Sequence, residues 1–209
     1  MFSNLSGTEI ALFLVSLLVA MVFHEVMHGF VAHLLGDTTA KDEGRLTLNP
    51  LKHIDLYTTI LLPLVLLMVG LPPLLVAKPV PFNPERLKYE EFGTALVGIA
   101  GPLTNLFLAI VASMVFRITH PIIGSLVYEG LGIFVWINAG LFIFNLIPIP
   151  PLDGSRVLYA LAPEPIQEIM QRIEAFGFIA VLAFVLIAYQ FFSGPLSNII
   201  SSLVGFLLG

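Results

Sequence analysis

The sequence predicts an all-α membrane protein that crosses the bilayer several times, and three observations support this prediction. Hydrophobic residues make up 57% of the 209 residues and charged residues only 11%, whereas soluble domains carry about 25% charged residues. The mean hydropathy is +0.97. Apolar stretches recur at lengths near the roughly 20 residues that a helix needs to cross a membrane. An ordinary soluble enzyme and a disordered tail are therefore excluded. The net charge of −5 also excludes a nucleic-acid binder, which needs a basic surface.

Five stretches qualify as membrane segments by length and composition. They are Thr8–Leu35, Leu56–Ala77, Gly93–Phe116, Val127–Ile147 and Met170–Phe192. A sixth stretch, Pro195–Leu208, is short for a span, so we expect five to six segments. The first stretch lacks the positive start of a signal peptide and is too long in its apolar part. We interpret residues 1–209 as a single integral membrane domain.

The second stretch differs from the others because proline and glycine interrupt it. It contains Pro63, Gly70, Pro72 and Pro73, which kink or end helices. We expect this segment to be re-entrant or broken, so that it dips into the membrane and returns. If it does, the first and fourth stretches run parallel and their deep ends meet. If it crosses instead, those two helices run antiparallel and the deep ends lie far apart.

Three ionisable residues lie inside the first apolar stretch, in the pattern His24-Glu25-Val26-Met27-His28. A charged side chain at mid-bilayer costs a few kcal/mol, so this cluster needs a compensating partner. Residues i and i+4 share one helix face, and two imidazoles placed there can bind one cation. HExxH on a helix is the zinc-ligand pair and general base of metalloproteases. The alternative is a pair of buried structural histidines.

Tetrahedral zinc with two histidines and one water needs one more protein ligand. Asp153 follows the fourth apolar stretch, after prolines that unwind the helix and before Gly154. It is either the third ligand or the N-cap of a following helix. His53 is an alternative ligand or a substrate contact, although Lys52–Asp55 reads equally well as an interfacial loop. His33 lies about 140° around the helix from His28 and is a poor candidate.

Taken together, these motifs resemble the site-2 protease family of intramembrane zinc metalloproteases, in particular its short prokaryotic members. The resemblance covers most of Val19–Leu158. It rests on five motifs in order, which are the HExxH, Gly44–Asp55, Lys78–Pro84, Gly101–Asn105 and Asp153-Gly154.

The resemblance implies roles for five residues. His24, His28 and Asp153 would bind Zn²⁺, and Glu25 would be the catalytic base. Asn145, in the NxxPxPxxDG pattern, would assist substrate or oxyanion binding. Its alternative is an interhelical hydrogen bond worth about 1 kcal/mol. We interpret Gly101, Pro102 and Asn105 as packing residues.

The implied function is a zinc endopeptidase that cuts peptide bonds within or near transmembrane segments of membrane proteins. Its expected partners are such a substrate and the lipid bilayer, and its expected location is the prokaryotic cell membrane. The chain has no room for a PDZ insertion or a CBS pair, so we expect no regulation by these domains. The alternatives are a transporter or metal-binding membrane protein and a non-catalytic relative on the same fold.

Two loop segments bear on substrate binding. Arg45–Leu48 and Val80–Phe82 read as short extended or β pieces, since their alternation and prolines exclude helix. Either they hold a substrate in extended form by strand addition, or they are ordinary surface loops.

Overall fold

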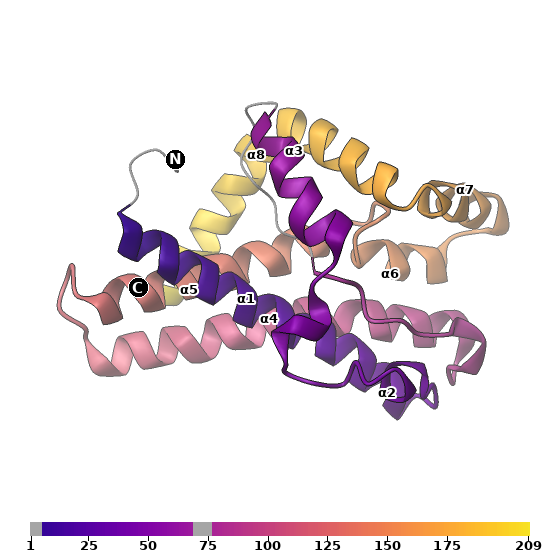
Figure 1. Ribbon diagram of the computed structural model, residues 1–209, viewed down its shortest axis with the longest axis horizontal. Coiled ribbons are helices and arrows are strands. Elements are labelled where there is room, and N and C mark those ends of the chain that lie inside the picture. The colour runs from indigo at the N-terminus through magenta and orange to yellow at the C-terminus, as the bar shows by residue number, and fades with distance from the viewer. Residues whose placement is uncertain (1–5, 69–76) are drawn as a thin grey trace.

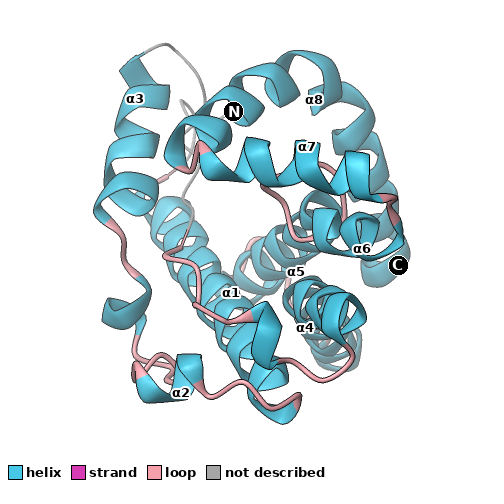
Figure 2. Cartoon of the chain, turned by 90° about the vertical axis from the view of Figure 1, so that its right-hand side faces the viewer, coloured by secondary structure: helices cyan, strands magenta, loops and turns pink. Residues whose placement is uncertain are grey.

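The computed structural model describes residues 6–68 and 77–209, and within these ranges the chain is helical, with no strand. Figures 1 and 2 show the arrangement. The elements, in chain order, are α1 (Gly7–Leu34), α2 (Thr39–Asp42), η2 (Pro50–His53), η3 (Leu56–Leu61), α3 (Leu62–Met68), η4 (Pro84–Arg86), α4 (Glu90–Thr119), α5 (Leu126–Asn145), α6 (Gly154–Leu161), α7 (Glu164–Ala175) and α8 (Phe178–Leu208).

Three helices in the described part of the chain, α1, α4 and α5, are long and apolar enough to cross a membrane. A fourth span is counted only if α7 and the first part of α8 are taken together, and these two are bent by 102°. The expected five to six segments are therefore not confirmed. One reason is that Met170–Phe192 is divided between amphipathic α7 and apolar α8. Another is that the Leu56–Leu66 and Gly194–Leu208 helices are short.

Helices α1 and α5 run parallel, with α4 antiparallel to both. Near the start of α1, a methyl group on Gly130 would lie 3.4 Å from Leu12. In the middle, Asn105 of α4 bonds both Ala20 of α1 and Asn138 of α5. Figure 1 shows the same three directions. The parallel arrangement of the first and fourth stretches is thus confirmed.

Small buried residues let these three helices approach closely. Ala20, Ala109 and Ala139 are completely buried, and small residues permit close helix contact in membranes. The closely packed helices bring the interior of α1, which carries His24, to the level at which α5 ends and the chain continues to Asp153.

The two ends of the Leu56–Ala77 stretch lie together. The Lys78 amide donates to the His53 carbonyl at 2.7 Å, which agrees with a segment that enters and returns. Its first part is the π-helix η3, capped by Asp55, and Pro63 falls in the first turn of α3, where the π pattern gives way to α. Gly70, Pro72 and Pro73 lie outside the described residues.

The predicted β pieces at Arg45–Leu48 and Val80–Phe82 are non-helical as expected, but neither is a strand. Backbone groups in this region bond side chains and a loop carbonyl instead of a neighbouring strand. Arg45 donates to the carbonyls of Lys78 and Pro79 at 2.8 and 3.3 Å. Sequence alternation could not reveal these partners, which lie more than 30 residues away.

Candidate metal centre

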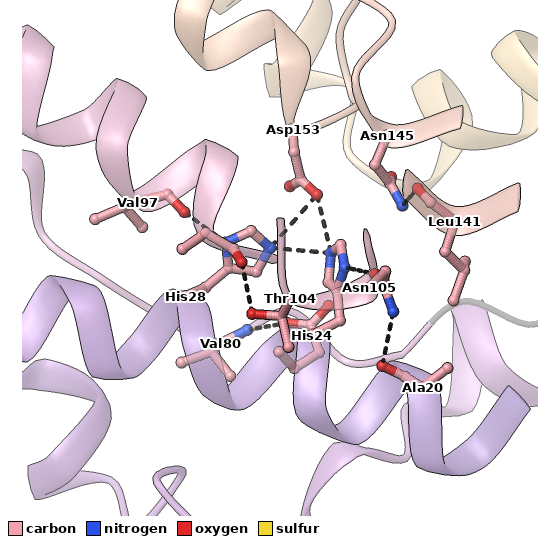
Figure 3. A network of polar contacts seen from close by, with 12 residues as sticks. Ala20, His24, His28, Val80, Val97, Thr104, Asn105, Leu141, Asn145 and Asp153 are labelled. Carbon is pink, nitrogen blue, oxygen red and sulfur yellow. Dashed lines mark hydrogen bonds and ion pairs between the residues drawn. The ribbon is translucent and has the colours of Figure 1, made fainter. Parts of the chain in front are cut away.

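Helix α1 carries His24, Glu25 and His28 inside its apolar length. His24 lies about 15 Å from the Leu34 end and about 26 Å from the Gly7 end at 1.5 Å per residue. Both histidines face inward, with 7% and 8% of their surface exposed. The turn after α5 brings Asp153 to them (Figure 3). Asp153 stands at the N-cap of α6, yet its side chain makes no capping hydrogen bond, so its carboxylate serves the histidines instead.

The three side chains converge on a small volume. Asp153 Oδ2 lies 2.9 Å from His24 Nε2 and 3.4 Å from His28 Nε2. The two Nε2 atoms are 3.0 Å apart. Zinc bonds of 2.0–2.1 Å in a tetrahedron would separate neighbouring ligand atoms by about 3.3 Å. The observed separations are close to this value, so the donor set fits a zinc ion.

The far side of each imidazole is fixed by an acceptor. His28 Nδ1 lies 2.7 Å from the Val97 carbonyl oxygen, which can only accept, so Nδ1 carries the proton. His24 Nδ1 lies 2.5 Å from Asn105 Oδ1. In a neutral ring the Nε2 atom then presents a lone pair. Two bare nitrogens and a carboxylate oxygen therefore face one another, an arrangement that a bound cation stabilises.

Gly101 of α4 leaves the space beside these atoms open. A Cβ added there would contact the Nε2 atoms of both His24 and His28, at 2.6 Å from that of His24. A side chain at this position would compete for the space that a metal ion needs. The prediction that Gly101 and Asn105 are packing residues is incomplete, because Asn105 bonds His24 and Gly101 leaves room beside both histidines. Nothing in the local sequence pattern distinguishes these roles from packing.

A cavity of 470 Å³ opens from the cluster, and its lining includes Glu25, Asn145 and Asp153. The Val80 amide donates to Glu25 Oε2 at 2.9 Å, so a backbone group holds the carboxylate. Asn145 is half-buried, and its amide donates to the Leu141 carbonyl of its own helix at 3.0 Å. Every residue of the predicted site except Asn145 thus makes a contact between separate segments.

The other three histidines, His33, His53 and His120, lie outside the cluster. His53 is 3% exposed, and its Nε2 lies 2.8 Å from the Thr47 carbonyl oxygen. His33 is in the last turn of α1. In the part of the chain that the structure describes, the group able to hold a metal comprises His24, His28 and Asp153.

Comparisons with known proteins agree with this site. The model of Peptidase family M50 matches residues 120–188, which contain Asn145 and Asp153. The chain is 37% identical over 175 residues to YwhC of Bacillus subtilis, named as a zinc metalloprotease, covering 80% of this chain and 77% of YwhC. It is 36% identical over 154 residues to MJ0611 of Methanocaldococcus jannaschii, also named so, covering 72% of each.

A third relative is more distant. Rip2 of Mycolicibacterium smegmatis, again named as a zinc metalloprotease, is 27% identical over 168 residues, covering 79% of this chain and 62% of Rip2. No solved structure matches the chain. The match to YwhC over most of both proteins, together with the M50 match around Asp153, leads to one conclusion: the chain belongs to peptidase family M50, the site-2 metalloproteases that its motifs resemble.

Proposed function

We propose that the chain is an intramembrane zinc endopeptidase that hydrolyses peptide bonds within or near transmembrane segments of other membrane proteins. One observation carries the proposal. Two imidazole nitrogens and a carboxylate oxygen converge within 4.8 Å inside an apolar helix bundle, with Glu25 beside them on the same cavity. Membership of the M50 family and the names of the relatives support it.

In this proposal His24, His28 and Asp153 hold the zinc ion. Zinc bound there supplies a Lewis acid that lowers the pKa of a bound water and polarises a carbonyl. The remaining steps belong to the protein. Asn105 and the Val97 carbonyl hold the two rings in the ligating orientation. The surrounding apolar helices keep bulk water away from the site.

Glu25 is the proposed general base. It takes a proton from the attacking water and gives it to the amine nitrogen as the carbon–nitrogen bond breaks. The Val80 amide keeps Glu25 Oε2 directed toward the cavity. Asn145 borders the same cavity and is proposed to orient the substrate carbonyl. Its amide nitrogen carries two N–H groups, so one can donate to that carbonyl while the other stays on the Leu141 carbonyl.

The proposed substrate is a transmembrane helix that unwinds locally. A helical peptide bond hides its carbonyl in a backbone hydrogen bond, so a segment must open before Glu25 and water can reach it. The cavity walls are largely apolar, as Phe82, Phe144 and Phe178 illustrate. Such walls fit hydrophobic side chains from a membrane-embedded substrate. We propose the prokaryotic cell membrane as the location of the protein.

The test uses the purified protein in detergent, with zinc content and cleavage of a panel of transmembrane peptides as readouts. We expect Glu25→Gln to retain about one zinc and to lose at least about 100-fold in cleavage rate. Asp153→Ala should lose both zinc and activity. Ser113→Ala is the matched control, because Ser113 is buried in α4 and its hydroxyl donates to the Ile110 carbonyl of the same helix.

Two outcomes would contradict the proposal. Zinc bound by wild type with no cleavage of any peptide would favour a metal-binding or transport protein. Cleavage that persists in Glu25→Gln would remove Glu25 as the base.

A further inference from the structure

We propose that Asn105 and Asn138 form a relay that positions His24 for metal binding. The inference rests on the proposed zinc site and extends it to helices α4 and α5. Both asparagines are completely buried, and neither belongs to the HExxH or to the Asp-Gly motif. Figure 3 shows Asn105 lying between His24 and the α1 backbone.

The relay begins at a helix carbonyl. The Asn138 amide nitrogen donates to the Phe134 carbonyl oxygen at 2.9 Å. Because that carbonyl can only accept, the Asn138 side chain cannot be reversed without losing this bond. Its oxygen must then point the other way, toward α4.

The second step fixes Asn105. Asn138 Oδ1 accepts from the Asn105 amide nitrogen at 3.0 Å, and the Ala20 carbonyl accepts from the same nitrogen at 3.3 Å. Two acceptors on one side hold the nitrogen there, so Asn105 Oδ1 must face His24. It lies 2.5 Å from Nδ1 of that ring.

The third step fixes the imidazole. An amide oxygen beside Nδ1 requires the proton on Nδ1 and leaves Nε2 bare. The donor and the acceptor of each hydrogen bond are thus fixed one after another, from the Phe134 carbonyl through Asn138 and Asn105 to His24. Partners that hold the far nitrogen of a ligating histidine change metal affinity by about 10- to 100-fold. Asn105 and Asn138 are therefore positioning residues and do not touch the substrate.

The relay differs from simple packing in one measurable respect. Asn138 acts on the metal only through Asn105, so its contribution should disappear once Asn105 is gone. A packing role would instead lower the thermal stability of the metal-free protein and leave its zinc affinity unchanged, because residues in contact couple in stability whatever their role. Leucine is the test substitution because it is an apolar side chain of similar shape and branching.

The experiment compares zinc affinity, measured by chelator competition, in wild type, Asn105→Leu, Asn138→Leu and the double variant. We expect Asn105→Leu to bind zinc about 10- to 100-fold more weakly and Asn138→Leu to show a smaller loss. The double variant should match Asn105→Leu. The control is Ser113→Ala, which removes a buried hydroxyl about 12 Å farther along α4 and should leave zinc affinity as in wild type.

Folding is measured by thermal unfolding of the metal-free proteins. The double variant guards against misfolding, because removing both partners leaves no unpaired amide between the helices. Unchanged zinc affinity in Asn105→Leu, or a double variant whose loss is the product of the two single losses, would overturn the relay. Absence of zinc from wild type would instead remove the metal site itself, and the relay with it.

Discussion

At the scale of single residues, the absence of a side chain at position 101 matters as much as the histidines themselves. Gly101→Ala would place a methyl group against the Nε2 atoms of both His24 and His28. We therefore expect the variant to lose bound zinc and cleavage while the helices stay folded. Zinc content after gel filtration measures this.

The matched control for that experiment is Gly132→Ala in α5. Among the described residues, no atom of another segment lies within 4 Å of a methyl group placed there, so zinc content should equal that of wild type. Alanine also favours helix over glycine by up to about 1 kcal/mol. Equal zinc content in Gly101→Ala and wild type would show that the ion, if bound, lies away from this glycine.

Some residues of the candidate site can be predicted from the sequence and others cannot. His24, Glu25 and His28 are visible because one helix turn carries all three. Asp153 could be predicted only indirectly, because two histidines and a water leave a tetrahedral zinc ion one protein ligand short. The contacts of Asn105 and Asn138 could not be found from the sequence, because an asparagine that bonds a histidine and one that bonds a helix carbonyl look the same until the helices are packed.

At the scale of elements, Asp37 joins the loop after α1 to the segment before α4. Its carboxylate accepts from the Thr39 amide and hydroxyl and from the Asn83 amide, the last at 2.7 Å. Burial raises the pKa of Asp37, but the hydrogen bonds from Thr39 and Asn83 outweigh it, and the net pKa is lowered.

This lowered pKa gives a pH dependence. A group whose pKa is lower in the folded state stabilises the fold above its unfolded value, which is about 3.9 for Asp. The stabilisation is lost as pH falls through the lowered folded pKa. Asp37→Asn replaces a carboxylate oxygen with an amide NH2 group, which faces a backbone N–H that it cannot accept from. We therefore expect about 1–3 kcal/mol of destabilisation and a smaller loss of stability as the pH falls.

Thermal unfolding in detergent between about pH 6 and about pH 3 measures both effects. The control is Asp42→Asn at the end of α2, where the exposed carboxylate accepts from the Thr38 hydroxyl and stability should change by less than about 0.5 kcal/mol. If Asp37→Asn loses stability with falling pH as steeply as wild type does, another group causes the acid sensitivity.

The elements were predictable to different degrees. The positions of α1, α4 and α5 followed from length and apolar composition. The bend between α7 and α8 did not, because Met170–Phe192 is apolar enough to read as one span, whereas Gly177 adopts a positive φ of 53° that turns the chain. Glycine tolerates that conformation, and one glycine in an apolar run gives no warning of it.

At the scale of the whole molecule, the chain has a long-loop end and a short-turn end. The hydrogen bond from the Lys78 amide to the His53 carbonyl brings both ends of the Leu56–Ala77 stretch together, and the Lys88 amide bonds the Leu35 carbonyl where α1 finishes and α4 begins. The opposite end carries the connection from α4 to α5. The parallel relation of α1 and α5 follows from this arrangement.

Labelling of single cysteines tests this arrangement, and the chain has no native cysteine to interfere. We expect thiols introduced at exposed Lys52 and Glu85 to react from the same side of sealed vesicles. A thiol at Ile123, which is 83% exposed, should react from the other side. Reaction of Lys52→Cys and Glu85→Cys from opposite sides would contradict a returning segment.

The position of His24 along α1 also has a kinetic consequence. The shorter path from aqueous solvent, about 15 Å, starts at the Leu34 end, against about 26 Å from the other end. Each turnover consumes one water molecule, so hydration of the site should be supplied mainly across that leaflet. A membrane-impermeant chelator added to that compartment alone should then remove bound zinc faster than the same chelator added to the opposite compartment.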